Sequence, residues 1–288
     1  MKAPIFTYRR PDDLDGALAL LADHAGEAQV LAGGQSLMPA LNMRLSSPGM
    51  LVDINRIGTL RGISDRGNVI RIGALVRHAE VAESSLLTSR VPLIALAMPH
   101  VAHMAVRNRG TTCGSLALAD PSAEMPAVAV TLDAQIVLHK RGATRTVFAR
   151  TFFKGLYQTA RDDNEIITDV LFPVAQSDEV FGFAELSRRH GDFATVGVAI
   201  RARQKPGALE DLSVVFFGSE PTPLLSPSAR SVTLPADSTD AALAGAARAM
   251  TADMEPIDNH QGRGDTKRKQ ATVLLQRALR DMLGRIHV

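Results

Sequence analysis

Two short loops of small residues constrain this chain more than any other feature of its sequence. The first is Ala32-Gly33-Gly34-Gln35-Ser36-Leu37, and the second runs from Thr111 to Ser115. Glycines in such loops allow positive φ angles and let the backbone approach a ligand closely. Successive peptide N–H groups that point into one concavity at a helix start suit a pyrophosphate. For one loop alone, an ordinary turn between a strand and a helix is the better explanation, whereas two loops together favour a clamp on a dinucleotide.

Neither loop has the spacing of the common nucleotide-binding fingerprints. The G-x-G-x-x-G pattern of Rossmann turns and the G-x-x-x-x-G-K-[ST] pattern of P-loops are both missing from these segments. The sequence therefore predicts a dinucleotide site that is not built on a Rossmann turn.

The patterns around the loops predict three successive units. Leucines at helical spacing, short apolar runs and turn residues predict a small α/β subdomain in residues 1–56, with strands at 28–32 and 51–54 and helices at 12–26 and 36–42. Asp12 or Asp13 is expected to cap the first helix. Residues 57–175 are expected to form a second subdomain, with strands at 69–73, 135–140, 146–148 and 166–172 and a helix over 92–107. A further helix is expected to open at Asp120, capped by Asp120 or Ser122, with Pro121 in its first turn.

A polar stretch without periodicity, residues 174–180, predicts a domain boundary. Beyond it, strands are expected at 181–186, 195–203 and 212–217, and amphipathic helices at 239–250 and 265–284. Strands followed by helices predict an α+β domain in residues 176–288, with the helices on one face of an antiparallel sheet.

The composition excludes several classes of function. The chain has 288 residues, with 32 Lys and Arg against 30 Asp and Glu, so it gives no reason to expect a nucleic-acid partner. Its apolar stretches are shorter than the roughly 20 residues of a membrane span, and its first residues lack a signal-peptide pattern, so we expect a cytoplasmic protein. The single cysteine, Cys113, cannot hold an iron–sulfur cluster, which takes about four cysteine ligands. His100 and His103 lack the further ligands that a metal site needs, and we nominate no catalytic residue.

The two loops and a third segment together resemble a known family. The first loop resembles its AGGxSL signature, and residues 107–121 resemble its RNxGTxGG(N/S)xxxADP signature. The third segment, Arg188-Arg189-His190-Gly191-Asp192-Phe193-Ala194, resembles RRxGD(Y/F)A. These motifs are typical of the FAD-binding medium subunits of molybdenum hydroxylases, the family of xanthine dehydrogenase and carbon monoxide dehydrogenase. The order and spacing of the three segments are similar to those of the family's motifs along essentially the whole chain.

The resemblance implies a fold and a cofactor. The fold would be α+β: a PCMH-like FAD-binding domain of two subdomains, 1–56 and 57–175, and a C-terminal domain of the carbon monoxide dehydrogenase flavoprotein type in 176–288. FAD would be bound without a covalent link. Its pyrophosphate would lie on the two loops, which implicates Ala32, Gly33, Gly34, Gln35, Ser36, Leu37, Thr111, Cys113, Gly114 and Ser115.

Three further residues are implicated by the same resemblance. Asp120 and Glu124 match acidic positions near the ADP half of FAD, where a carboxylate that accepts ribose hydroxyl hydrogen bonds makes chemical sense. Phe193 matches an aromatic residue that lies over the flavin in some relatives. A helix cap for Asp120, a structural role for Glu124 and core packing for Phe193 stay open as alternatives.

The resemblance also implies partners. A large partner chain would carry the molybdenum cofactor, and a small one would carry [2Fe–2S] clusters, in a heterotrimer that pairs into a dimer. Electrons would pass from the clusters to FAD on this chain and leave to an external acceptor, with the protein supplying binding and orientation. The alternatives are a self-contained flavin oxidase with a covalent flavin link, or a scaffold subunit without FAD.

Two positions depart from the family pattern. Cys113 stands where many relatives have glycine, so either a small buried residue or a thiol with redox or covalent chemistry near the flavin is expected there. Glu185 stands where several relatives have lysine. Any contact that this lysine makes with the flavin therefore cannot be carried over to this chain.

Overall fold

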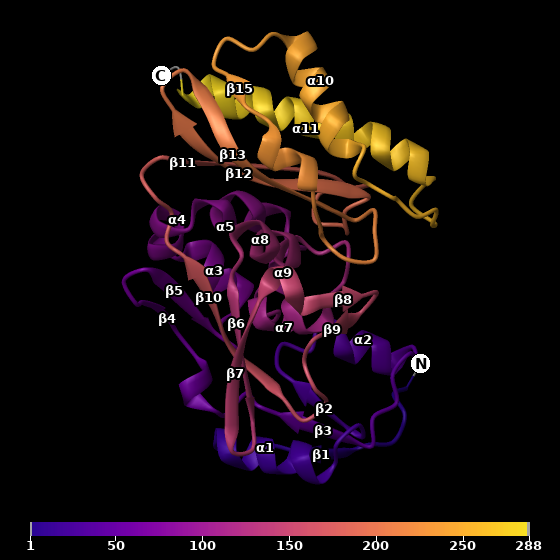
Figure 1. Ribbon diagram of the computed structural model, residues 1–288. Coiled ribbons are helices and arrows are strands. Elements are labelled where there is room, and N and C mark those ends of the chain that lie inside the picture. Colours follow the sequence, from indigo (N-terminus) through magenta and orange to yellow (C-terminus); the bar gives the residue numbers. More distant parts are fainter. Residues whose placement is uncertain (1, 287–288) are drawn as a thin grey trace.

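The structure is a computed structural model that describes residues 2–286. Its three units follow one another along the chain, and the first and last units lie at opposite ends of the molecule (Figure 1). Helices and strands are mixed throughout, which confirms the predicted α+β class. Within the described part of the chain, no helix is both long enough and apolar enough to cross a membrane.

The first unit is built around a small parallel sheet. Its elements are β1 (Thr7–Arg9), α1 (Leu14–Asp23), β2 (Ala28–Leu31), α2 (Leu37–Asn42) and β3 (Met50–Asp53). The strand order is β1-β3-β2, and both pairings are parallel. Asp13 caps α1 as predicted, because its Oδ1 accepts a hydrogen bond from the Gly16 N–H at 2.7 Å. The first glycine loop therefore lies at the carboxyl end of β2, between that strand and α2.

The second unit is built on an antiparallel sheet in the order β4-β5-β10-β6-β7. Its strands are β4 (Ile63–Asp65), β5 (Val69–Gly73), β6 (Gln135–Lys140), β7 (Ala143–Phe148), β8 (Phe153–Gly155), β9 (Gln158–Thr159) and β10 (Ile166–Pro173), of which β8 and β9 form a separate hairpin. Its α-helices are α3 (His78–Glu83), α4 (Ser85–Arg90), α5 (Pro92–Ala97), α6 (Met104–Arg107), α7 (Thr112–Leu118), α8 (Glu124–Leu132) and α9 (Ala149–Phe152). Of these, α8 is buried along its whole length, which explains why its sequence shows little amphipathic pattern.

Three sequence predictions in this unit need correction. The helix expected over 92–107 is broken into α5, a 3-10 turn at Met98–His100 and α6, and Ala102 between them has a φ of 47°. The segment expected as a second loop, 111–115, is the start of α7, with Thr111 as its cap. Neither Asp120 nor Ser122 caps α8, whose N-cap is Ala123. Instead the Asp120 Oδ1 accepts a hydrogen bond from the Ser122 N–H at 2.9 Å, which closes a turn between the two helices.

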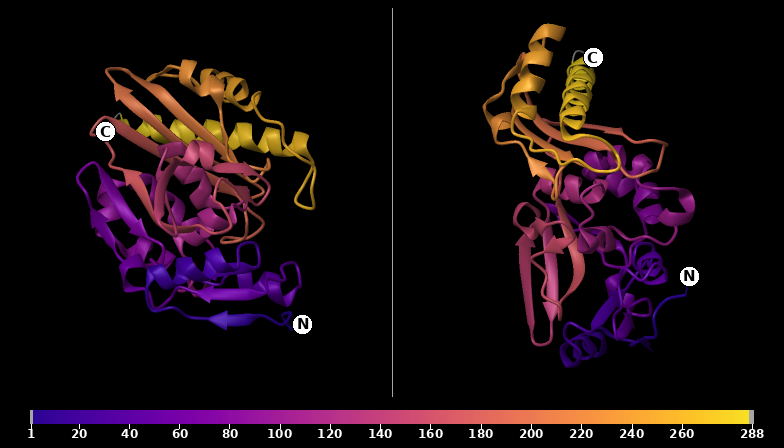
Figure 2. Two further views of the ribbon diagram at one scale, coloured as in Figure 1. Left: turned by 60° about the horizontal axis from the view of Figure 1, so that its bottom comes forward. Right: turned by 90° about the vertical axis from the view of Figure 1, so that its right-hand side faces the viewer.

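The third unit has the predicted antiparallel sheet with helices on one face. Its elements are β11 (Glu179–Leu186), β12 (Val196–Lys205), β13 (Ala208–Phe217), β14 (Leu224–Leu225), β15 (Leu234–Pro235), α10 (Asp240–Thr251) and α11 (Gly264–Ile286). Figure 2 shows α10 and α11 on the outer side of the sheet. The inner side packs on α5 and α8 of the second unit. One hydrophobic core therefore joins the second unit to this face of the sheet, and a second core lies between the sheet and its two helices.

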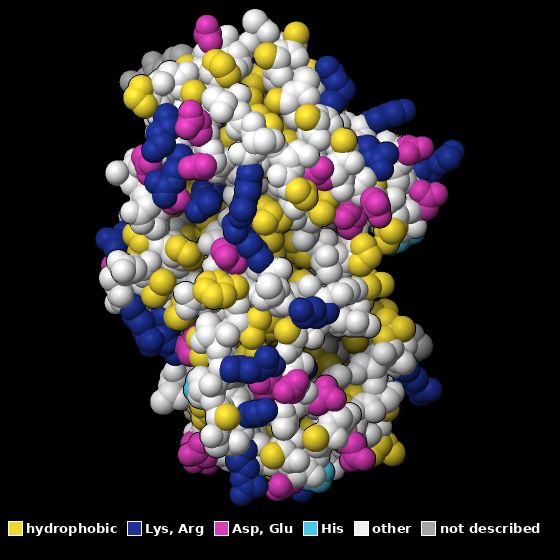
Figure 3. Space-filling view, in the orientation of Figure 1, with side chains coloured by type: hydrophobic (Ala, Val, Ile, Leu, Met, Phe, Trp, Pro, Cys, Tyr) yellow, Lys and Arg dark blue, Asp and Glu magenta, His cyan; other side chains and the backbone are white. Residues whose placement is uncertain are grey.

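The surface carries charges of both signs. On the face shown in Figure 3, Lys and Arg side chains are interspersed with Asp and Glu side chains. This mixture agrees with the near balance of charge in the sequence.

Candidate functional site

The first predicted loop meets Arg109 and Gly110, directly before the second, and Gly33 is the point of contact. A Cβ added at Gly33 would lie 2.3 Å from the carbonyl oxygen of Arg109 and 2.9 Å from the Cα of Gly110. No side chain fits in that space, because the neighbouring atoms belong to the backbone. Gly34 has a φ of 71°, a conformation that favours glycine. The glycine pair thus allows two segments about 75 residues apart in the sequence to pack backbone against backbone.

A polar network holds the two loops in register. The Asn55 Nδ2 donates to the Ala32 carbonyl oxygen at 2.8 Å, and the Arg77 guanidinium donates both to the Asn55 Oδ1 and to the Arg109 carbonyl oxygen, each at 2.5 Å. Arg77 itself is anchored through its backbone N–H, which donates to the Glu80 carboxylate at 2.9 Å. One arginine fork therefore connects both loops through groups with fixed geometry.

Asp53 completes the network at the carboxyl end of β3. Its Oδ1 accepts from the Asn55 backbone N–H at 2.9 Å and from the Asn55 side chain at 2.6 Å, and its Oδ2 accepts from the Tyr8 hydroxyl. Burial alone would raise the pKa of Asp53, but the hydrogen bonds from Tyr8 and Asn55 hold that pKa below its ordinary value. The residues Asn55 and Arg77 were not identified from the sequence. For Asn55 a signal existed, since it is a polar residue directly after a buried strand.

A cavity of about 470 Å³ opens beside the first loop. It is lined by Ala32–Gln35, by the Met38–Asn42 side of α2, and by Asp53, Asn55 and Arg109. Its size is within the range of small-molecule sites. It also lies at the carboxyl ends of two parallel strands, where α/β sheets usually bind ligands. Four of the predicted first-loop residues, Ala32–Gln35, therefore share one concave surface with Arg109, which precedes the second loop. Ser36, Leu37 and the predicted residues of 111–115 are not part of its lining.

Cys113 lies behind the second loop. Its side chain is buried and its Sγ is 3.8 Å from the Ile72 carbonyl oxygen of β5, so the thiol points into the core. Burial is the main reason that the pKa of this thiol is raised well above its ordinary value. Because Cys113 lies in the first turn of α7, it takes the place of a glycine without a positive φ angle. Thr111 is the N-cap of α7, and its Oγ1 accepts a hydrogen bond from the Gly114 N–H at 3.0 Å.

The predicted acidic residues follow α7 and are both buried. Asp120 is 9% exposed, and its Oδ2 accepts a hydrogen bond from the Tyr157 hydroxyl at 3.2 Å. Tyr157 lies in the turn between β8 and β9. Glu124 is 6% exposed, and burial followed by repulsion from Asp120 raises the pKa of Glu124 to about 7. The Gly218 N–H donates to the Pro121 carbonyl oxygen at 2.8 Å. The segment that carries both acids is thus tied to the C-terminal sheet.

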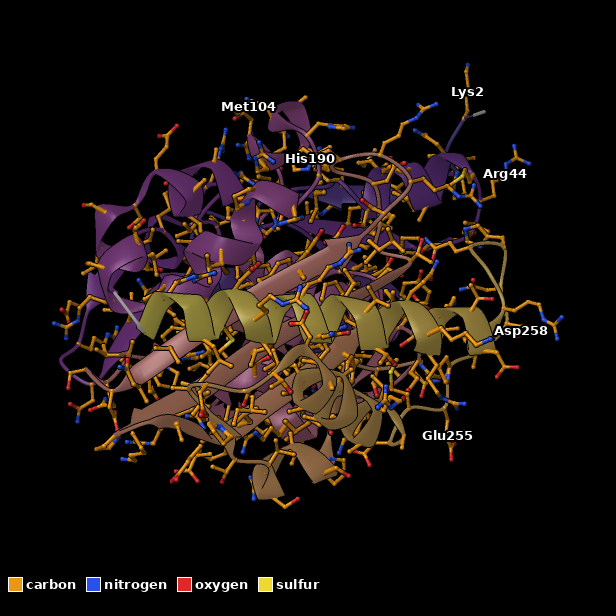
Figure 4. The ribbon with its side chains drawn as sticks, turned by 90° about the horizontal axis from the view of Figure 1, so that it is seen from above. Lys2, Arg44, Met104, His190, Glu255 and Asp258 are labelled. Carbon is orange, nitrogen blue, oxygen red and sulfur yellow. The ribbon has the colours of Figure 1, made fainter. Side chains whose placement is uncertain are left out.

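The third motif forms the connection between β11 and β12, and it packs beside α6. A Cβ added at Gly191 would lie 2.9 Å from the His103 Nδ1, and the rings of His100 and His190 are 5.8 Å apart. Figure 4 shows Met104 of α6 and His190 on the same edge of the molecule. Phe193 is 57% exposed, so core packing does not explain this aromatic residue. The structure therefore brings the third motif next to the helix that leads into the second loop.

Comparisons with known proteins agree with this arrangement. The family described as the FAD binding domain in molybdopterin dehydrogenase matches residues 4–175, and the CO dehydrogenase flavoprotein C-terminal domain matches residues 181–282. The carbon monoxide dehydrogenase medium chain of Hydrogenophaga pseudoflava is 34% identical over 97% of each chain.

Two solved structures have the same fold along the whole chain. The carbon monoxide dehydrogenase of Hydrogenophaga pseudoflava that lacks the Mo-pyranopterin moiety of its molybdenum cofactor superposes with a TM-score of 0.94, at 34% identity and 99% coverage of each chain. Quinoline 2-oxidoreductase from Pseudomonas putida 86 superposes with a TM-score of 0.93, at 33% identity and the same coverage. The chain therefore belongs to the family of FAD-binding medium subunits of molybdenum hydroxylases, which includes the carbon monoxide dehydrogenase medium chains.

Proposed function

We propose that this chain holds FAD without a covalent link and passes electrons from iron–sulfur clusters on a partner chain to an external acceptor. The backbone contact at Gly33 carries the proposal, because it joins the first loop to the segment that leads into the second, beside a cavity of about 470 Å³. The cofactor supplies the electron chemistry when it is bound. This chain contributes binding, orientation and the exclusion of water.

The proposed roles follow from where the structure puts each residue. Backbone N–H groups of the first loop (Ala32, Gly33, Gly34, Gln35, Ser36 and Leu37) and that of Cys113 would face the pyrophosphate. The N–H groups of Gly114 and Ser115 already donate to Thr111, so Thr111, Gly114 and Ser115 would form the surface beside it. Cys113 would contribute only its backbone, since its thiol faces the core. Asp120 and Glu124 would form hydrogen bonds with hydroxyl groups of the cofactor. The exposed Phe193 would lie over the flavin ring. Asn55 and Arg77 would hold the two loops at the distance that the cofactor needs.

The partners are part of the same proposal. The chain has one cysteine and no second thiol with which to share a cluster, so the [2Fe–2S] clusters would lie on a small partner chain and the molybdenum cofactor on a large one. The assembly would be a cytoplasmic heterotrimer that pairs into a dimer. We propose residues 1–56, 57–175 and 176–288 as its two FAD-binding subdomains and its C-terminal domain.

The test is the visible absorbance of the purified full chain, before and after denaturation and filtration. We expect a flavin spectrum whose chromophore passes the filter and is identified as FAD. Flavin that stays with the polypeptide would contradict the non-covalent site and support a self-contained oxidase. A chain that stays colourless with added FAD would contradict the proposal itself.

Gly33→Ala makes the test specific for the loop contact. Its Cβ would meet the Arg109 carbonyl oxygen, so we expect FAD affinity to fall more than about tenfold, or about 1.4 kcal/mol. Gly58→Ala is the matched control, because nothing lies within 4 Å of a Cβ at that position. Equal FAD affinity in both variants would remove the role assigned to the loop contact.

A further inference from the structure

The cavity beside the first loop is lined by two ionisable side chains, those of Asp53 and Arg109. The Asp53 carboxylate has its partners within the chain. It accepts hydrogen bonds from Tyr8 and Asn55, and its Oδ2 lies 3.6 Å from the Arg10 Nε. Arg109 is exposed, and its guanidinium forms no hydrogen bond or ion pair with any residue in the range 2–286. The charge left without a partner in this cavity is therefore positive.

The neighbouring arginines are already engaged. The Arg77 guanidinium bonds to the Asn55 side chain and to the Arg109 carbonyl oxygen, and the Arg61 guanidinium donates to the Asn55 carbonyl oxygen at 2.8 Å. Burial, followed by repulsion from Arg109 and then from Arg61, lowers the pKa of Arg77. An anion bound beside Arg109 would reduce this repulsion.

The first loop adds uncharged donors to the same cavity. The backbone N–H groups of Gly33, Gly34 and Gln35 donate no hydrogen bond to any residue within the described range 2–286. All three residues line the cavity together with Arg109. Successive peptide N–H groups and a guanidinium, all without acceptors, make a donor set that fits an anion. A diphosphate has enough oxygens to accept from the loop and from the arginine at once.

The backbone of Arg109 is fixed independently of its side chain. Its carbonyl oxygen packs against Gly33 and accepts from Arg77, and its own N–H donates to the Val106 carbonyl oxygen at 3.1 Å. These contacts use only backbone atoms of Arg109, so a change of its side chain leaves them in place. A loss of binding in such a variant therefore reports on the guanidinium and not on the loop contact.

We propose that the Arg109 guanidinium forms an ion pair with the diphosphate of the bound cofactor and gives the site its preference for a ligand that carries this diphosphate. This inference rests on the proposed function of the site. A guanidinium is planar and can donate two parallel N–H groups to phosphate oxygens. Because Arg109 is exposed, salt should screen the pair and weaken it.

The test is a titration of the flavin-free full chain with FAD, followed by flavin fluorescence, at about 20 mM and about 500 mM NaCl. At low salt we expect the Kd of Arg109→Gln to be about tenfold higher than that of the wild type. Arg109→Lys keeps the charge but loses the fork, so it should lose less, and Arg109→Glu should lose more because it repels the phosphates. These differences should become smaller at high salt.

A matched control and a second ligand make the result specific. Arg66→Gln removes the same charge at an exposed position between β4 and β5, and it should bind FAD like the wild type at both salt concentrations. ADP carries the diphosphate without the flavin, so it should compete with FAD in the wild type. In Arg109→Gln its inhibition constant should be about tenfold higher.

Each contrary result points to one failure. Equal FAD affinities in the wild type and Arg109→Gln at low salt would overturn the ion pair. So would one equal loss in the Lys, Gln and Glu variants at both salt concentrations, since that indicates a purely structural effect. If ADP fails to compete in the wild type, or competes equally well in Arg109→Gln, the diphosphate is not the group that Arg109 contacts. A wild type that binds no FAD fails the proposed function itself, which the other outcomes leave standing.

Discussion

Two glutamates with raised pKa values lie on either side of the boundary between the FAD-binding domain and the C-terminal sheet. Glu124 and Glu185 come from separate domains, and burial raises the pKa of each above the ordinary glutamate value. The third acid is Asp120, which accepts a hydrogen bond from the hydroxyl of Tyr157. Tyr157 has a φ of 55°. At neutral pH the Glu185 carboxyl group of the folded chain is therefore mainly protonated. The stability of the chain should depend on that proton.

The first prediction concerns stability against pH. The pKa of Glu185 is raised from 4.5 to about 8 on folding, so between these values the folded chain keeps a proton that the unfolded chain has lost. The stabilisation is complete below about pH 4.5 and is lost as pH rises through about 8. In the absence of FAD, Glu185→Gln should therefore melt at least about 2 °C above the wild type at pH values above 8. Thermal unfolding followed by circular dichroism checks this, and a difference independent of pH would contradict it.

At the scale of elements, the site is built where strands end and helices begin. The first loop connects β2 to α2, Asn55 follows β3, and Arg77 is the residue before α3. Asn55 and Arg77 bond to backbone carbonyls of the two loops, and these bonds have fixed directions. A guanidinium can reach two acceptors at once, whereas an ammonium acts as a single point charge. The spacing of the loops should therefore depend on the arginine and not only on its charge.

The second prediction is that Arg77→Lys weakens FAD binding about tenfold or more while keeping the fold. The lysine cannot bond to the Asn55 Oδ1 and the Arg109 carbonyl oxygen in the same geometry. Arg66→Lys, at an exposed position between β4 and β5, is the control and should bind FAD like the wild type. Isothermal titration calorimetry with FAD measures both variants. Equal FAD affinities for Arg77→Lys and Arg66→Lys would show that positive charge alone is sufficient at position 77.

At the scale of the whole molecule, the FAD-binding domain and the C-terminal sheet share one core. Phe181 and Phe217 of the sheet belong to the same hydrophobic cluster as Leu93 and Ile94 of α5. The Pro121–Gly218 hydrogen bond crosses the same boundary. Residues on one side of the boundary thus lose buried area if the other side unfolds, and the two domains should not unfold independently.

The third prediction is a single cooperative thermal transition for the chain without cofactor. Phe217→Ala should lower the stability of the whole chain by about 3–5 kcal/mol, because its ring fills the shared core. Phe148→Ala, which removes a half-exposed ring at the end of β7, should change it by less than about 1 kcal/mol. Differential scanning calorimetry would refute the shared core if it resolved two transitions and Phe217→Ala moved only one of them.

The sequence was a good guide to elements whose signals are local. The cap at Asp13, the strands on either side of the glycine pair and the two final helices follow from periodicity, capping and turn residues, which act within a few positions. The helix expected over 92–107 was wrong because Ala102 takes a positive φ, which the composition of that stretch does not reveal. The caps expected at Asp120 or Ser122 were wrong because Asp120 closes its own turn instead.

The sequence by itself determined the fold class, the family resemblance and the segments that carry the site, because glycine pairs and strand patterns restrict the backbone wherever they occur. Only the tertiary structure decided which atoms face each other. It placed the Cys113 thiol in the core, joined the loops through Asn55 and Arg77, and set Glu185 opposite Glu124 across a domain boundary. These contacts join residues far apart in the chain, and burial and electrostatic repulsion depend on distance in space, which no local pattern in a sequence encodes.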